Sequence, residues 1–441
     1  MCTVQMRNPL FLGIILATLG AAGQASAAEA FPLRNGDTWV MSGDSITAQH
    51  LHSNYFEAFC YARYPRLEFR FRNSGVGGDT IPKLMARFDW DVAAWKPTVV
   101  SVELGMNDQG GFSVDQYITN MRGLSERIKS ISARPVFFTS SPINNGDTSA
   151  KLGGNTKLNE FALALKSLAA EQGAPFADQF HSVLDVWGRN KPKENLANAL
   201  ASIRTAAQDD TLAGVEHLRA FLSAQEKSTE HPVSMQGDPV HPGPPGQLIM
   251  AAALLKELGA DGFVSSATLD ASGKVIEAKG CTAEGVVAQG GKLAFDRLDE
   301  SIAFPIPDEA RSVLALFPTI LELSQYRLRV SDLPSERYTL RVDGETTATL
   351  TAQELEHGIN LTSFGQGPIA AQGKRVLDAV RAKEQLVGQW RSQSRAASAS
   401  DATAEAKEKL ASLFRAVEDA DAMIRAEAKP RKFRCELSPA H

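Results

Sequence analysis

The serine at position 45 has the neighbours that a serine nucleophile requires. It follows an apolar run at 39–41 and the turn residues Gly43 and Asp44, a pattern that predicts a buried strand ending just before a helix. Ser45 would then lie beside the unpaired backbone N–H groups of a helix N-terminus, which stabilise the negative charge formed when serine attacks a carbonyl. The same pattern is typical of a helix N-cap, so the rest of the chain must decide between the two.

Two more polar segments follow later predicted strands. Segment 73–80 is rich in glycine and contains Gly78, and segment 105–108 contains Asn107. Glycine lets the backbone approach a ligand closely, so the Gly78 N–H and the Asn107 amide are both candidate donors to an oxyanion. The alternatives are a glycine-rich βα turn and a helix cap. A dinucleotide loop is weakly supported because the G-x-G-x-x-G pattern is absent.

The segment 238–242 supplies a candidate general base. It reads Asp-Pro-Val-His-Pro, so His241 could accept the serine proton and Asp238, three residues earlier, could orient the imidazole ring. The alternative is a proline-rich turn with a surface histidine. Other histidines lack a partner in a recognisable motif and are interpreted as surface or structural residues: His50, His52, His181, His217, His231 and His357.

Neither of two familiar hydrolase motifs is present. An H-E-x-x-H zinc pattern is absent, and Thr47 occupies the position of the last glycine in a G-x-S-x-G elbow, which argues against an α/β-hydrolase. We therefore expect no metal and no cofactor.

Strand-like and helical segments alternate through the first part of the chain, which predicts a parallel sheet covered by helices on both faces. The expected strands are 37–41, 67–72, 98–104, 135–139 and 175–177. The expected helices are 48–64, 80–95, 113–130, 151–171 and 243–259. Segment 67–72 alternates apolar and charged residues, which predicts a half-exposed strand near the sheet edge.

Together these segments resemble the sequence blocks of the SGNH hydrolases, also called GDSL esterases/lipases, over residues 36–260. The resemblance implies an α/β fold with a flavodoxin-like, doubly wound parallel five-stranded sheet in the order 2-1-3-4-5. In that order the strands before Ser45 and Asn107 are neighbours at the switch point, where ligands are expected.

The resemblance also implies a role for each candidate. Ser45 would be the nucleophile, His241 the base and Asp238 its partner. The oxyanion hole would consist of the N–H groups of Ser45 and Gly78 and the side chain of Asn107. All four blocks match the family pattern.

The N-terminus has the features of a secretory signal peptide. Arg7 precedes a short apolar core at 10–19, and small residues end in an A-x-A site at Ala27, which predicts cleavage after Ala27 and a periplasmic or secreted protein. The apolar core is short for a membrane span, so no stable membrane insertion is expected after cleavage. An uncleaved anchor is the less favoured alternative.

The remaining chain divides by composition. We expect the catalytic domain at 28–260 with a helical insertion at 189–235, a small antiparallel β-rich module at 261–373, and a helical C-terminal tail at 374–441. The insertion would consist of two helices, at 195–207 and 212–226. The tail would break between two helices within 392–403 and fray at its end.

Charge and cysteine content restrict the partners. The chain has 441 residues and a net charge of −5, and cleavage at Ala27 removes one basic residue to leave −6. No basic cluster with interleaved aromatic residues is present, which argues against nucleic acid. Cys60, Cys281 and Cys435 would remain in the exported chain, where one disulfide is permitted and its pairing is open.

These observations favour a secreted serine esterase that forms a covalent acyl-enzyme on a small-molecule or glycan ester. The compartment and the β-rich module favour a carbohydrate O-acetylesterase or a similar short-acyl esterase. A lipase, lysophospholipase or arylesterase is one alternative, and a noncatalytic glycan-binding or scaffold protein is another, which the intact candidate residues argue against. The acyl group, the alcohol and the oligomeric state stay open.

Overall fold

The computed structural model describes residues 31–144, 153–189, 193–212, 214–227 and 237–440. The expected signal peptide and His231 lie outside the described residues. No helix in these ranges is both long enough and apolar enough to cross a bilayer.

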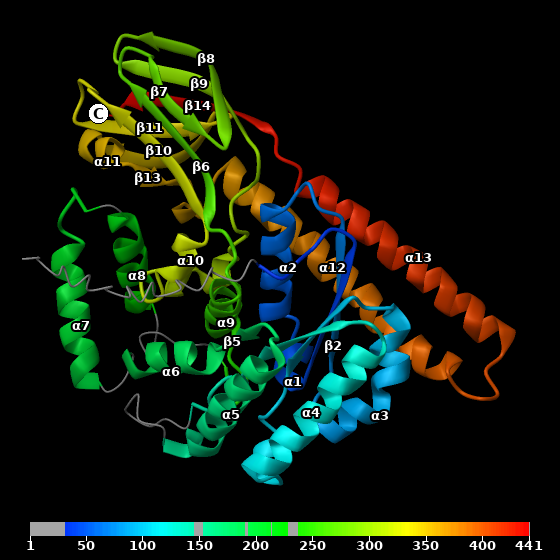
Figure 1. The fold of residues 1–441 in the computed structure, drawn as a ribbon. Helices are drawn as coiled ribbons and strands as arrows, with labels where there is room; N and C mark the ends of the chain where they lie inside the picture. The colour runs from blue at the N-terminus through cyan, green and yellow to red at the C-terminus, as the bar shows by residue number, and fades with distance from the viewer. Residues whose placement is uncertain (1–30, 145–152, 190–192, 213, 228–236, 441) are drawn as a thin grey trace, which may run out of the picture.

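A five-stranded parallel sheet organises the first part of the chain, in the order β2-β1-β3-β4-β5 (Figure 1). Its strands are β1 (Asp37–Gly43), β2 (Phe69–Gly75), β3 (Val99–Glu103), β4 (Arg134–Phe138) and β5 (Phe176–Ala177). The last residues of β1 and β2, Gly43 and Gly75, are paired in register, and Gly43 also pairs with Glu103 of β3. The expected fold class and strand order are confirmed, and the ends of three strands meet at one edge of the sheet.

Helices cover both faces of this sheet. One face carries α2 (His52–Arg63) and α9 (Pro244–Glu257). The other carries α3 (Ile81–Asp91), α4 (Val114–Ser130) and α5 (Thr156–Gln172). The helix expected at 48–64 begins later, at His52, because the short helix α1 (Ser45–Ala48) ends at Ala48 and His50, which follows it, has φ of +56°.

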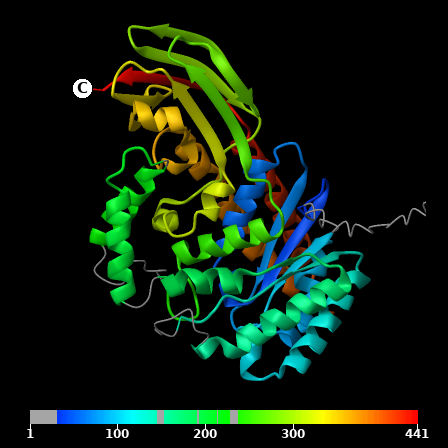
Figure 2. The same ribbon diagram turned by 60° about the vertical axis from the view of Figure 1, so that its left-hand side comes forward.

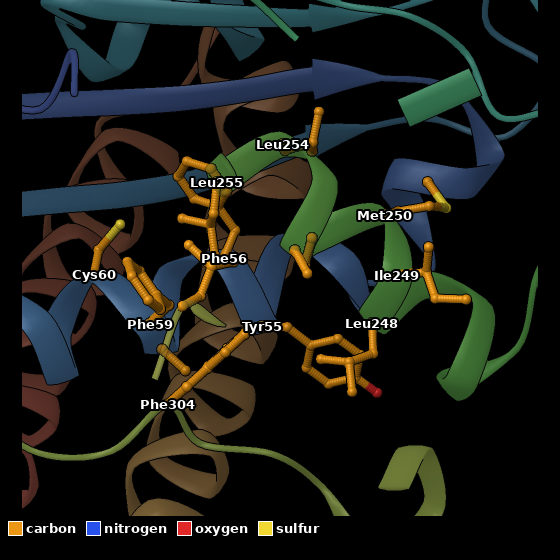
Figure 3. Close-up of a cluster of buried hydrophobic side chains, with 14 of the residues drawn as sticks. Tyr55, Phe56, Phe59, Cys60, Leu248, Ile249, Met250, Leu254, Leu255 and Phe304 are labelled. Carbon is orange, nitrogen blue, oxygen red and sulfur yellow. The ribbon is translucent and has the colours of Figure 1, made fainter. Parts of the chain in front are cut away.

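The packing of α2 on α9 forms the largest apolar core. Figure 3 shows Phe56 and Phe59 of α2 facing the aliphatic side chains of α9. Phe59 also meets Phe304 edge-on, with the ring centroids 5.1 Å apart. Phe304 follows β9 (Lys292–Asp299) of the β-rich module, so the module shares this core with the catalytic domain.

Helix α6 (Gln179–Arg189) follows β5 and packs on α9 in the core of the catalytic domain. Helices α7 (Lys193–Ala206) and α8 (Val215–Lys227) lie within 189–235, the segment where we expect a helical insertion. In Figures 1 and 2, α7 and α8 project to one side of the sheet and extend toward the β-rich module.

The β-rich module contains two sheets around a separate apolar cluster. A four-stranded sheet has the order β13-β10-β6-β7, and a five-stranded sheet has the order β12-β11-β14-β9-β8. The first sheet comprises β6 (Phe263–Asp270), β7 (Val275–Lys279), β10 (Gln325–Ser331) and β13 (Ile359–Asn360). The second comprises β8 (Cys281–Gln289), β9 (Lys292–Asp299), β11 (Arg337–Val342), β12 (Glu345–Thr351) and β14 (Lys432–Pro439). Short helices α10 (Thr319–Glu322) and α11 (Ala352–His357) and the turn η4 (Asp308–Val313) join them.

Two expectations for this region are wrong. The module is not purely antiparallel, because β10 pairs with β6 in parallel. The end of the chain does not fray, because β14 is hydrogen-bonded between β11 and β9. The expected helical tail is therefore a pair of helices, α12 (Pro368–Ala397) and α13 (Ala404–Glu427), that leaves the module and returns to it. The break between them lies inside the predicted range of 392–403.

The expectation of a half-exposed β2 is also wrong. Arg72 on this strand is only 1% exposed, because its guanidinium binds Asp421 of α13 at 2.7 Å. Helix α12 lies against β2, α2 and α3. The alternating charges at 67–72 mark a strand at the sheet edge, as expected. That edge faces helices from the end of the chain and not water.

Candidate active site

Ser45 lies where the sequence pattern places it, at a strand-to-helix junction. Asp44 caps α1, and its Oδ1 accepts a hydrogen bond from the Ile46 N–H at 2.9 Å. The turn is tight at Gly43, where a Cβ would lie 2.0 Å from Thr47 Oγ1. Glycine is required there, and the result is a partly exposed Ser45 at the start of α1.

The structure brings the predicted base and its partner to this serine. His241 Nε2 lies 2.7 Å from Ser45 Oγ, and His241 Nδ1 lies 2.8 Å from Asp238 Oδ2. The other carboxylate oxygen of Asp238 accepts the backbone N–H groups of Val240 and His241, each at 2.8 Å. These bonds, first among them the one from the His241 backbone, lower the pKa of Asp238 and fix the ring through its own loop.

The two predicted oxyanion donors flank the same site at the ends of β2 and β3. Gly78 is exposed and has φ of +69°, a conformation in which an L side chain is strained. Asn107 is exposed, and its Nδ2 donates to the Asp79 carbonyl at 2.9 Å and lies 3.4 Å from Asp44 Oδ2. The long contact to Asp44 is weak, so a developing oxyanion could displace it.

Asp44 carries an unusual carboxyl group beside this donor. Burial, followed by the nearby charge of Glu103, raises the pKa of Asp44 to about 8. The carboxyl is therefore mostly neutral at pH 7, which makes it a poorer acceptor and removes a negative charge from the vicinity of the oxyanion.

A buried polar network beneath α1 escaped the sequence analysis. Glu103 at the end of β3 accepts from Thr47 Oγ1 at 2.6 Å and lies 3.1 Å from His52 Nε2. Gln247 on α9 accepts from the His52 N–H at 2.9 Å and donates to the Pro242 carbonyl at 3.0 Å. The network thus connects the serine helix with the loop that carries His241.

His52 is a structural residue, as expected, but it is not an isolated one. Burial acts to lower the pKa of His52, but the charge of Glu103 and hydrogen bonds to Glu103 and Gln247 raise it overall. The sequence contains no signal for this pairing, because Glu103 and Gln247 lie far from His52 along the chain.

The sequence analysis overlooked a second Asp-x-x-His pair, Asp178 and His181, in which the histidine does not contact a serine. His181 Nδ1 lies 2.6 Å from Asp178 Oδ2, and His181 Nε2 lies 2.9 Å from Asn159 Oδ1. The histidine at 181 therefore has partners on both ring nitrogens, contrary to our expectation. The spacing was visible in the sequence, but only the structure shows that an amide oxygen occupies the position held by Ser45 at the other pair.

Metal and disulfide chemistry have no assembled site within the described ranges. These residues contain no group of three or more His, Cys, Asp or Glu that could hold a metal ion. Cys60, Cys281 and Cys435 are all free thiols, and burial raises the pKa of both Cys60 and Cys435.

A doubly wound parallel sheet with a serine, an Asp-His pair and an asparagine at its carboxyl edge defines the SGNH class of hydrolases. Residues 41–249 match the model of the GDSL-like lipase/acylhydrolase family. An acetylxylan esterase of Geobacillus stearothermophilus is 24% identical over 216 residues, which cover 46% of this chain and 79% of that protein. The family match covers the catalytic part of the chain, and the protein is a carboxylic ester hydrolase of the SGNH/GDSL type.

A solved structure extends the likeness in fold beyond the catalytic domain. It is described as a gut microbial diltiazem-metabolizing enzyme, and it superposes with a TM-score of 0.71 at 19% sequence identity. The match covers 93% of this chain and 99% of that one. The two chains therefore share an overall architecture that includes regions outside the family match.

Proposed function

We propose that the protein is a secreted serine esterase that removes short acyl groups, most readily O-acetyl groups, from carbohydrates. The observation that carries the mechanism is the continuous chain from Ser45 Oγ to His241 Nε2 at 2.7 Å and from His241 Nδ1 to Asp238 Oδ2 at 2.8 Å. In this geometry a nucleophile is hydrogen-bonded to a base, and a carboxylate holds the base in its orientation.

The reaction follows from the positions of these atoms. His241 takes the proton of Ser45 as Oγ bonds to the ester carbonyl carbon, and the carbonyl oxygen becomes negatively charged. The N–H groups of Ser45 and Gly78 and the Asn107 amide stabilise that oxyanion. Collapse of the intermediate breaks the C–O bond to the alcohol, which receives the proton from His241. Water, activated by His241, then attacks the acyl-enzyme and frees the acid and Ser45.

The substrate class rests on three observations. The sequence relative is named as an acetylxylan esterase, the N-terminal segment has the features of an export signal, and the Asp238–His241 pair is open to solvent. The side chains of Asp238 and His241 are 59% and 31% exposed. An open site of this kind accommodates a bulky sugar alcohol more readily than an enclosed acyl tunnel does.

The chemistry is tested by labelling. A fluorophosphonate probe should modify the protein at Ser45, as identified by peptide mass spectrometry, and no label at Ser45 would refute the acyl-enzyme. The substrate class is tested with p-nitrophenyl esters of increasing chain length beside acetylated xylo-oligosaccharides. We expect kcat/KM to be highest for acetyl esters, and a maximum at eight carbons or more would instead indicate a lipase.

Export is tested by N-terminal sequencing of protein recovered outside the cytoplasm. The mature chain should begin at or near Ala28. Exported protein that still carries Met1 would contradict cleavage.

A further inference from the structure

Along the outer edge of the catalytic sheet, Lys and Arg side chains from the C-terminal helices bind the main-chain carbonyls of β2. As an edge strand, β2 has main-chain carbonyls with no strand partner. The carbonyl of Phe69 accepts from Arg425 at 2.8 Å, that of Phe71 from Lys383 at 2.8 Å, and that of Gly75 from Arg391 at 3.0 Å. All three donors lie on α12 or α13, outside the part of the chain that matches the family model.

Arg391 is the donor nearest to the reacting groups, because its acceptor ends β2. A Cβ on Gly75 would lie 2.4 Å from the Ala48 N–H nitrogen, so Gly75 is packed directly against α1. The next residue, Val76, donates its N–H to the Gly43 carbonyl at 3.1 Å. A shift of the end of β2 would therefore also displace the turn that presents Ser45.

Arg391 also begins a buried relay of ion pairs that ends on the oxyanion loop at 75–80. Its guanidinium makes two bonds to Asp91, at 2.6 and 2.7 Å. Asp91 is fully buried and also binds Arg87, whose guanidinium holds Asp79 Oδ2 at 2.7 and 3.0 Å. The carbonyl of Asp79 in turn accepts from Asn107 Nδ2 at 2.9 Å.

The relay explains how a flexible, glycine-rich loop can hold a fixed shape. Gly77 and Gly78 are exposed and a Cβ on either would contact nothing, so packing does not position them. The buried contacts that hold the loop lie at its ends, where Arg391 binds the Gly75 carbonyl and Arg87 binds the Asp79 carboxylate. Within the loop, the Asp79 N–H donates to the Val76 carbonyl at 3.2 Å, and the exposed Lys83 donates to the Gly78 carbonyl at 2.7 Å. A preorganised donor costs no reorganisation when charge develops, whereas a mobile one does.

We propose that Arg391 is a positioning residue for the oxyanion hole, so that α12, which the family model does not cover, is part of the catalytic apparatus. The proposal deepens the proposed function and rests on it. Arg391 does not contact the reacting atoms; it acts through Gly75, Asp91 and the loop that carries Gly78.

A double-mutant cycle tests this role. Arg391→Gln should lower kcat about 10-fold and change KM less than 2-fold, because a misplaced donor matters mainly once the oxyanion has formed. In an Asn107→Ala background the same substitution should cost less than about 3-fold, because the hole is already impaired. The acidic limb of the pH profile should be unchanged, since His241 and Asp238 lie outside the relay.

The matched control is Arg375→Gln. Arg375 lies on the same helix and pairs with Glu427 of α13 at 2.9 Å, with both side chains more than 40% exposed. This variant should keep wild-type kcat and KM. Arg391→Lys retains a cation near Asp91, but an ammonium group cannot also reach Gly75 as the planar guanidinium does. This variant should show a smaller loss in kcat than Arg391→Gln. It replaces Arg391→Gln in the test if that variant is insoluble.

Three results would overturn the proposal. They are an unchanged kcat in soluble Arg391→Gln and Arg391→Lys, an equal loss in the presence and absence of Asn107, and a loss that appears in KM alone. Each is distinct from failure of the proposed function, which is decided separately by fluorophosphonate labelling of Ser45 in the unmodified chain.

Discussion

The two sides of the proposed active site are built in opposite ways. On the base side, Asp238 and His241 are three residues apart on one loop, and their side chains are 59% and 31% exposed. On the oxyanion side, Asp91 has no exposed side-chain surface, and its partner Arg391 is 300 residues away in the chain. The contacts that support the base side are local and exposed to solvent. The contacts that support the oxyanion side are long-range and buried, although the donors Gly78 and Asn107 are themselves exposed.

The difference follows from what each side must do. A general base needs access to protons and water, and exposed charge pairs contribute little to stability, so the Asp238 loop can remain open. An oxyanion hole must hold its donors in place before charge appears. Buried ion pairs do this because removing one partner leaves an unpaired charge in a medium of low polarity, which typically costs about 3–5 kcal/mol.

The largest expected effect comes from removal of the Ser45 hydroxyl, on which the base and the oxyanion donors both act. Ser45→Ala should lower kcat for ester hydrolysis by about 10⁴-fold or more and abolish fluorophosphonate labelling, because it removes the hydroxyl that His241 Nε2 binds in the described part of the chain. Circular dichroism should show an intact fold. Ser182→Ala is the matched control, since Ser182 follows His181 of the second Asp-x-x-His pair, and it should label normally. Turnover near wild type in Ser45→Ala would refute the nucleophile.

The next effect tests the oxyanion side directly. Asn107→Ala should lower kcat about 10²–10³-fold, as loss of one oxyanion donor does, and leave KM nearly unchanged. Gln109→Ala is the control for disturbance of the same loop, because Gln109 Nε2 donates only within it, to the Met106 carbonyl at 3.0 Å and to its sulfur. A raised KM with unchanged kcat would make Asn107 a substrate-binding residue and remove it from the hole.

The base side should prove less sensitive. Asp238→Asn should lower kcat by about 10²-fold, at the lower end of the range for acid-base catalysis, because water can partly replace an exposed carboxylate. Asp178→Asn alters the same spacing at the second pair and should leave kcat unchanged. Equal effects of the two substitutions would contradict the assignment of Asp238.

The smallest effect concerns Asp44, which lies between the two sides. Its pKa is raised from 3.8 to about 8 in the folded protein, so from pH 4 to pH 8 the unfolded chain releases a proton that the folded chain retains. Stability therefore falls as pH rises through this window. Asp44→Asn removes that penalty, so its stability relative to wild type should increase steadily as the pH rises from 4 to 8, as measured by urea unfolding. A difference that does not vary with pH would contradict a neutral Asp44.

Residues close in sequence or at strand ends were predictable. The strand-turn-helix at Ser45, the Asp238–His241 spacing and the alternation of strands and helices depend on local propensity and period, and a parallel sheet brings its strand ends to one edge. For that reason a parallel sheet with polar segments at its strand ends could be anticipated from the residues themselves. The order of its strands and the roles of Ser45, Asn107 and His241 were implied by the resemblance to the SGNH hydrolases.

What only the tertiary structure decided are the pairings between distant segments. Arg72 alternates with apolar neighbours in the way of a solvent-facing residue, and nothing beside it indicates that Asp421 will bury it. The last residues have the composition of a fraying end, yet β14 lies between two strands formed more than 80 residues earlier. A charge or a strand edge shows that a partner is needed, but which segment supplies it depends on the packing of the whole chain.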